Sequence, residues 1–266
     1  MTSTARTERA SERAFFGISA LLFVASAAVT IVWSASMSAS GGMPTPGGTL
    51  SMAWMRMPGQ SWPGAAASFV GMWAVMMMAM MLPSLVPILS RYRQVAGRTV
   101  EARLGWLTAL VGLGYFLVWT LFGAAVFPLG AMLAAVRMEQ PAVARAVPIA
   151  AGVVFLIAGS LQLTAWKARH LAYCRDAPER GRTLPADART AWRHGLRLGF
   201  HCGRCCAGLM AILLVTGMMD LRAMVVVAAA ITVERLAPSG PRVAKAVGVL
   251  AIGAGSFLIA RAIWPG

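Results

Sequence analysis

A cluster of sulfur ligands stands at the head of one apolar run. The hexapeptide at residues 201–206, His-Cys-Gly-Arg-Cys-Cys, holds three of the four cysteines of the chain. Successive side chains on an α-helix are about 100° apart. With His201 at about 0°, Cys205, Cys202 and Cys206 follow at about 40°, 100° and 140° and share one side of the helix. Thiolates and an imidazole that converge in this way suit Cu(I), Zn(II) or an iron–sulfur centre.

Two local features favour the thiolate form that a metal requires. We expect the positive charge of Arg204 and the positive end of a helix that begins near the cluster to stabilise the thiolates. A disulfide framework is excluded because three of the cysteines are almost adjacent. The alternative is that the cysteines pack between helices as small apolar side chains. Three cysteines together with a histidine favour the metal site.

A second pair of soft ligands lies at His170 and Cys174, just past another apolar run. If this segment is helical, the spacing of four residues places both side chains on one face. The predicted topology puts the pair on the same side of the membrane as Cys202, so one composite site is expected. The alternative for this pair is a solvated loop.

Two further features could serve a metal. Met76, Met77 and Met80 lie close together on one helical face, and thioethers favour Cu(I). They form a candidate second metal path, although a methionine stripe of this kind also serves as ordinary packing. Glu234 is a carboxylate at membrane depth, which marks a functional candidate. Its alternative role is an interfacial ion pair with the adjacent Arg235.

The composition identifies an integral membrane protein. The 266 residues are 58% hydrophobic and 12% charged, against about 25% charged residues in soluble domains. The net charge of +15 does not indicate nucleic-acid binding, because the basic residues lie between long apolar runs and no nucleic-acid motif accompanies them. The patterns of nucleophilic triads, phosphate-binding loops and dinucleotide sites are absent as well. The chain is therefore more readily understood as a non-enzyme.

Apolar runs of about 20 residues predict an all-α bundle with about seven spans. The first run, of about 20 residues, is longer than the apolar core of a signal peptide, and the small-residue tail at residues 34–39 leaves a cleaved signal as the alternative. With the N-terminus in the cytoplasm, eighteen of the 24 basic residues fall in inner segments and five in outer ones, as the positive-inside rule requires. Residues 1–13 then form a cytoplasmic tail and residues 14–266 a single membrane domain in the inner (cytoplasmic) membrane. The expected spans cover residues 14–33, 65–89, 104–126, 146–166, 198–219, 223–236 and 243–263, and the sixth is unusually short.

A joint set of motifs resembles a known family. The motifs are Trp-x-x-Met-Met-x-Ala-Met-Met-x-Pro-Ser at residues 73–84, Gln-Leu-Thr-Ala-Trp-Lys at 162–167 leading to Cys174, the hexapeptide at 201–206, Gly-Met-Met-Asp-Leu at 217–221 and Glu-Arg-Leu-x-Pro at 234–238. Over about residues 65–240 the chain resembles bacterial integral membrane proteins of a domain of unknown function that are predicted to bind metal. The resemblance implies a polytopic helical fold with the Cys/His positions as the metal site. His170 replaces a cysteine usual in the family, and Arg235 replaces a lysine.

These observations predict a membrane protein that binds a soft transition metal, with copper first and zinc as the alternative. Such a protein would handle or deliver the metal to a membrane or soluble metal protein. The predicted ligands are Cys202, Cys205, Cys206, His201, Cys174 and His170. Two other functions stay open: a membrane thiol redox enzyme, and a structural subunit of a membrane complex.

Overall fold

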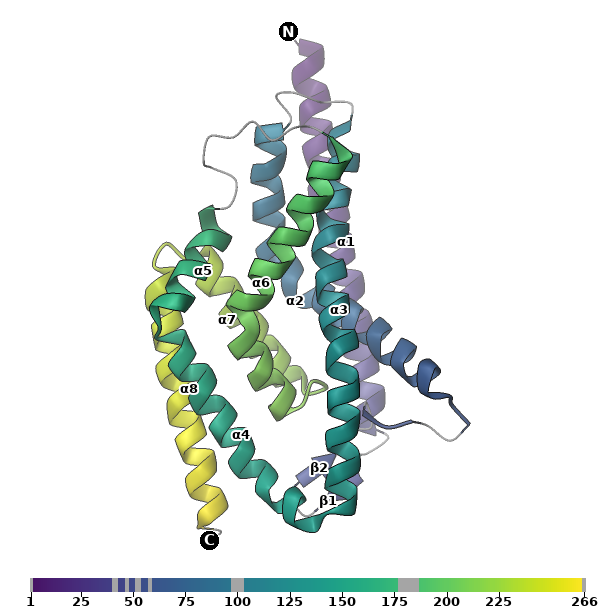
Figure 1. Cartoon of the computed structure of the whole chain (residues 1–266). Coiled ribbons are helices and arrows are strands. Elements are labelled where there is room, and N and C mark those ends of the chain that lie inside the picture. Colours follow the sequence, from purple (N-terminus) through teal and green to yellow (C-terminus); the bar gives the residue numbers. More distant parts are fainter. Residues whose placement is uncertain are drawn as a thin grey trace.

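The apolar runs of the sequence form long helices. The computed structural model describes residues 2–39, 43–45, 48–50, 54–56, 59–96, 103–176 and 187–264, and this part of the chain holds eight helices and one short hairpin (Figure 1). The elements are α1 Thr2–Ala39, β1 Met43–Thr45, β2 Gly48–Leu50, α2 Trp62–Ala96, α3 Leu104–Glu139, α4 Pro141–Gln162, α5 Ala165–Asp176, α6 Ala188–Thr216, α7 Leu221–Leu236 and α8 Gly240–Ile263. The two strands pair in antiparallel fashion.

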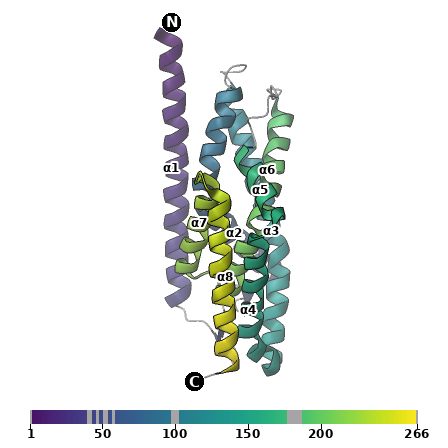
Figure 2. The same cartoon turned by 90° about the vertical axis from the view of Figure 1, so that its left-hand side faces the viewer.

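The helices confirm the predicted polytopic bundle. Among the described residues, six helices are long and apolar enough to cross a membrane, namely α1, α2, α3, α4, α6 and α8. Helix α7, the short sixth span of the prediction, has 16 residues and a length of about 24 Å at 1.5 Å per residue. That is less than the roughly 30 Å of a hydrocarbon core. The two termini lie at opposite ends of the bundle (Figures 1 and 2).

Several helices are longer than the spans predicted for them, and α1, α2, α3 and α6 differ most. Helix α3 continues past the predicted end at residue 126 and through Pro128 to Glu139, because helices in a bilayer tolerate an internal proline. Helix α2 reaches Ala96. Helix α6 begins at Ala188, ten residues before the predicted start at residue 198. Its first turn is capped by the carboxylate of Asp187, which accepts a hydrogen bond from the Thr190 amide at 3.2 Å.

The centre of the bundle is formed by α2 and α6. In the most apolar stretch of each helix, 61% of the α2 residues and 56% of the α6 residues are buried, against 6% in α1. Helix α1 accordingly stands at the edge of the bundle (Figure 2). Helix α3 packs chiefly on α6, and α4 on α8. A Cβ atom at Gly195 of α6 would lie 2.2 Å from the Val111 carbonyl oxygen of α3, so the α3–α6 approach requires glycine.

A tight turn joins α6 to α7. Gly217 has φ of 114°, a conformation that favours glycine, and it ends α6. The Asp220 carboxylate then accepts hydrogen bonds from the amides of Arg222 at 2.8 Å and Ala223 at 3.2 Å, which starts α7. In Figure 1 this turn stops short of the lower ends of α3, α4 and α8. The turn therefore returns the chain towards the N-terminal end of the bundle before the other helices end.

Candidate metal centre

Four thiols meet at the packing contact of α5 with α6. Cys202, Cys205 and Cys206 come from α6 and Cys174 from α5, and all four are free and buried, with exposed fractions of 0%, 3%, 1% and 1%. Cys174 is a close neighbour of Cys205, Cys205 of Cys206, and Cys206 of Cys202. The sulfur atoms thus form a connected chain that enters the bundle from α5. We call these four side chains the thiol cluster.

The two predicted histidines lie beside the thiol cluster, at its more exposed side. Helix α5 is a true helix, as the spacing of His170 and Cys174 required. The ring centroids of His170 and His201 are 6.2 Å apart, while one turn further along both helices Cys174 contacts Cys205. His201 stacks on Tyr173 at 3.8 Å. Its Nδ1 atom is buried without a hydrogen-bond partner within the described parts of the chain, so this nitrogen is free to act as a ligand.

A guanidinium group faces the inner end of the thiol cluster. Arg235 of α7 donates a hydrogen bond to the Sγ atom of Cys202 at 2.8 Å and to that of Cys206 at 3.2 Å. It also donates to the Ser84 hydroxyl of α2 at 3.2 Å. The Tyr115 hydroxyl of α3 contacts Cys202 Sγ at 2.9 Å. A buried cation that points at two sulfur atoms favours their thiolate form, which is the form that binds metals.

The second buried cation is already neutralised. Lys167 Nζ lies 2.7 Å from Glu234 Oε2 and donates a hydrogen bond to the Cys205 carbonyl at 2.8 Å. Gln162 donates to the other oxygen of Glu234 at 2.8 Å. Glu234 therefore forms a buried ion pair with Lys167 of α5, and the expected interfacial pair with Arg235 is not what the structure has. Because the Glu234 carboxylate neutralises Lys167, the positive charge of Arg235 interacts with the thiols of Cys202 and Cys206 instead.

Two expected sources of thiolate stabilisation are wrong. Arg204 is exposed, and its guanidinium lies over the Phe200 ring at 4.4 Å. Cys202 follows 14 residues of helix, and the dipole effect fades beyond the first turn. Sequence reasoning missed Arg235, Lys167 and Tyr115 as neighbours of the thiols. Charged side chains at the ends of short apolar runs, in Trp166-Lys167 and Glu234-Arg235, were the signal that could have identified two of them.

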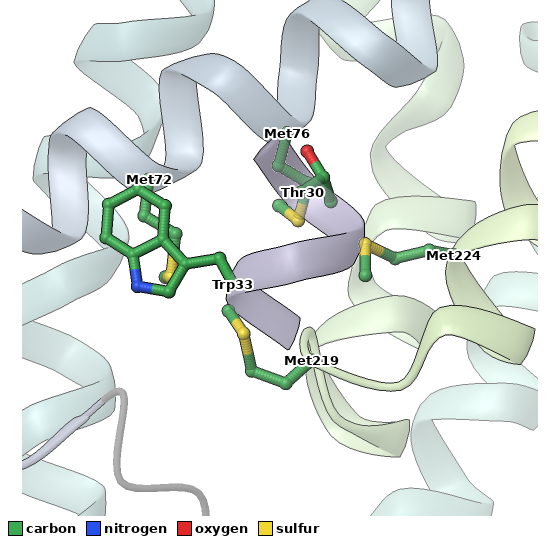
Figure 3. A pocket seen from close by; sticks show the side chains of 6 residues that line it. All are labelled: Thr30, Trp33, Met72, Met76, Met219 and Met224. Atoms are coloured by element: carbon green, nitrogen blue, oxygen red, sulfur yellow. The ribbon is translucent and has the colours of Figure 1, made fainter. Parts of the chain in front are cut away.

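The methionines of α2 are buried in the core. Met76, Met77 and Met80 have exposed fractions of 1%, 0% and 3%. Met76 also lines a small cavity between α1, α2 and the α6–α7 turn (Figure 3). Met76 therefore lines this cavity, whereas Met77 and Met80 are not among its lining residues.

The four thiols are close neighbours, but they are not arranged in the geometry of a metal coordination shell. Within the described ranges, no three Cys, His, Asp or Glu side chains are arranged around a common point as metal ligands. The cysteines instead contact one another in pairs and contact Arg235. Their chemistry suits a soft ion, and binding one would require the sulfur atoms to rotate away from these hydrogen bonds.

A comparison with models of protein families shows to which family the chain belongs. The model of a family described as PpoB2, copper chaperone, matches residues 70–258. The chain belongs to this copper chaperone family. The matched range includes the thiol cluster, His170, His201 and Arg235. Family membership confirms the predicted relation to metal-related proteins and indicates a role in copper handling. No curated protein and no solved structure matches the chain significantly.

Proposed function

We propose that this protein binds Cu(I) at the thiol cluster inside the membrane and passes the ion to a metal protein. The observation that carries the proposal is the buried Arg235 guanidinium, which points at Cys202 and Cys206 while Glu234 is engaged by Lys167. Membership of a copper chaperone family supports the same metal.

The charges of the site fit Cu(I) well. A Cu(I) ion bound by two thiolates carries one net negative charge, and Arg235 supplies one positive charge beside it. A buried complex of this kind is stable only when its charge is balanced. Zn(II) prefers four tetrahedral ligands, and with all four thiolates it would carry two net negative charges, which Arg235 alone does not balance. Zinc is therefore the alternative that metal analysis must distinguish.

The chain of sulfur contacts supports a route for release. Cu(I) exchanges readily between neighbouring thiolates because each new bond can form before the old one breaks. Movement from Cys206 to Cys205 and then to Cys174 brings the ion from the buried end of the cluster to α5. His170 and His201 stand beside that end. The acceptor protein would then receive copper at the exposed face of α5.

The proposed location is the cytoplasmic membrane, with the N-terminus inside. The support is the charge asymmetry, with eighteen basic residues in the predicted inner segments and five in the outer ones. Helix α5 then lies at the cytoplasmic side, where thiols stay reduced.

The proposal is tested by metal analysis of the full chain in detergent. The protein is loaded with Cu(I) under anaerobic, reducing conditions, freed of loose metal and analysed for copper, zinc and sulfur coordination by X-ray absorption. We expect copper with sulfur ligands, and loss of that copper when Cys202, Cys205 and Cys206 are all replaced by alanine. Ala207→Ser, at an exposed position on the same helix, is the matched control. Unchanged copper in the triple variant would refute the proposal.

The same variants address the two alternatives. A thiol redox enzyme needs its cysteines open to a partner, whereas the four thiols are at most 3% exposed. Mixed disulfides trapped with Cys205→Ser would nevertheless support a redox function. A structural subunit whose cysteines merely pack would bind no copper in the wild type and would keep its stability and phenotype in the triple variant.

A further inference from the structure

The search for a further site leads to the cavity between α1, α2 and the α6–α7 turn. Its lining consists of four methionines, Met72, Met76, Met219 and Met224, together with Thr30 and Trp33. Figure 3 shows these side chains around one space, from α1, α2, the turn and α7. The cavity measures about 10 Å³, which is close to the space of a single water molecule. The Ser34 hydroxyl donates a hydrogen bond to the Met219 carbonyl and holds α1 against the turn.

The lining selects for a soft monovalent cation. The Thr30 hydroxyl donates its proton to the Ser26 carbonyl at 2.7 Å, so its oxygen lone pairs stay available, and the other lining groups are thioethers and an indole. Thioethers bind Cu(I) and not hard ions such as Mg²⁺ or Ca²⁺. The indole ring of Trp33 adds attraction for a cation through its π face. Methionine often serves as filler in hydrophobic cores. Here, however, four methionines surround one small cavity.

The cavity lies at one end of a row of α2 side chains, and the thiol cluster lies at the other. Met72, Met76, Met80 and Ser84 follow one another at intervals of four residues, which places them on one face of the helix. Ser84 accepts a hydrogen bond from Arg235, the residue that contacts Cys202. From Met76 to Ser84 the helix rises by about 12 Å. Met80 stands midway in this row and is buried.

We propose that this thioether cavity is a second Cu(I) site, which takes up the ion at the outer half of the bundle and supplies the thiol cluster along α2. The inference rests on the proposed function, since it assigns the cluster as the acceptor. Neutral thioethers hold Cu(I) more weakly than thiolates do, because they contribute no negative charge. The ion therefore moves from the cavity towards the cysteines, with Met80 as the intermediate ligand.

The test is a Cu(I) titration of the full-length protein in detergent against a chromophoric Cu(I) chelator, with Ag(I) as a second probe. We expect about two ions per chain in the wild type. The double variant Met72→Leu/Met76→Leu should bind about one fewer, and its thiol cluster should load at least about tenfold more slowly. Met81→Leu is the matched control, because Met81 is a buried methionine of the same helix outside the cavity lining. Leucine has nearly the volume of methionine, so packing is preserved in each case.

The outcomes separate the two proposals. If the cysteine variant loses one ion and the methionine variant keeps both, the thioether site is refuted while the thiol cluster stands. If the methionine variant loses one ion and the cysteine variant keeps both, the cavity is supported as a site and the proposed function fails. Should the double variant not fold, Met219→Leu in the turn provides the same measurement. Wild-type stoichiometry and loading rate in Met219→Leu would then overturn the inference.

Discussion

The guanidinium of Arg235 lies 2.8 Å from the sulfur of Cys202. The two residues come from α7 and α6 and are separated by the α6–α7 turn. Because the carboxylate of the neighbouring Glu234 is bound to Lys167, adjacent residues of one helix serve different partners. The Glu234–Lys167 pair is neutral by itself. Arg235 and Cys202 are neutral together only when the cysteine is a thiolate.

Arg235→Gln should weaken Cu(I) binding and increase the protons released for each ion bound. Hydrogen bonds to charged groups contribute about 1.5–3 kcal/mol, so we expect a loss of about one to two orders of magnitude in affinity. Arg235→Lys retains the charge and should lose less. A chelator competition at several pH values measures both effects. Equal affinities and proton release in the glutamine variant and the wild type would show that Arg235 plays no part in binding.

Glu234→Gln should destabilise the fold. The change leaves the Lys167 ammonium, which is 3% exposed, without its counter-charge. Removing one partner of a buried pair costs about 3–5 kcal/mol. Thermal unfolding in detergent measures the loss. The double variant Lys167→Met/Glu234→Gln removes both charges and should recover much of the stability. A double variant less stable than Glu234→Gln would contradict this account.

Gly195→Ala should push α6 away from α3. The added Cβ atom would lie 2.2 Å from the Val111 carbonyl oxygen, a backbone atom that cannot rotate aside. Overpacking of this kind costs about 1–3 kcal/mol. We also expect reduced copper retention, because α3 carries the Tyr115 hydroxyl that contacts Cys202. Gly112→Ala on α3 is the control, since a Cβ atom there meets nothing within 4 Å. Equal melting temperatures for the two variants would disprove the close approach.

The start of α6 should loosen in acid. The hydrogen bond from Thr190 lowers the pKa of Asp187 below its ordinary value of 3.8. The cap contributes fully above that value and is lost as the pH falls through the lower pKa of the folded state. Amide exchange in the first turn of α6 should accelerate there, and Asp187→Asn, which still accepts a hydrogen bond, should remove the pH dependence. A pH dependence that persists in the asparagine variant would assign the effect to another group.

The sequence predicted the helices well and the environment of the thiols poorly. Apolar runs locate membrane helices because a bilayer requires about 20 apolar residues per crossing. Helical spacing likewise placed His201, Cys202, Cys205 and Cys206 on one side. Spacing within one helix cannot reveal which other helix supplies a neighbour. Arg204 was therefore credited with the charge that Arg235 provides from 31 positions further along the chain. The cavity was missed for the same reason, since Met219 and Met224 join Met72 and Met76 only through packing.

The solitary positive charge beside the thiols makes copper loading an electroneutral exchange. Before loading, Arg235 balances one thiolate. Afterwards it balances a Cu(I) ion held by two thiolates, because the arriving ion displaces one thiol proton. The charge buried in the bundle is the same in both states. The voltage across a bilayer acts on moving net charge. Filling the thiol cluster from the cytoplasmic side should therefore respond to proton concentration and be insensitive to membrane potential, whereas filling it through the thioether cavity carries a positive charge inwards and should respond to both.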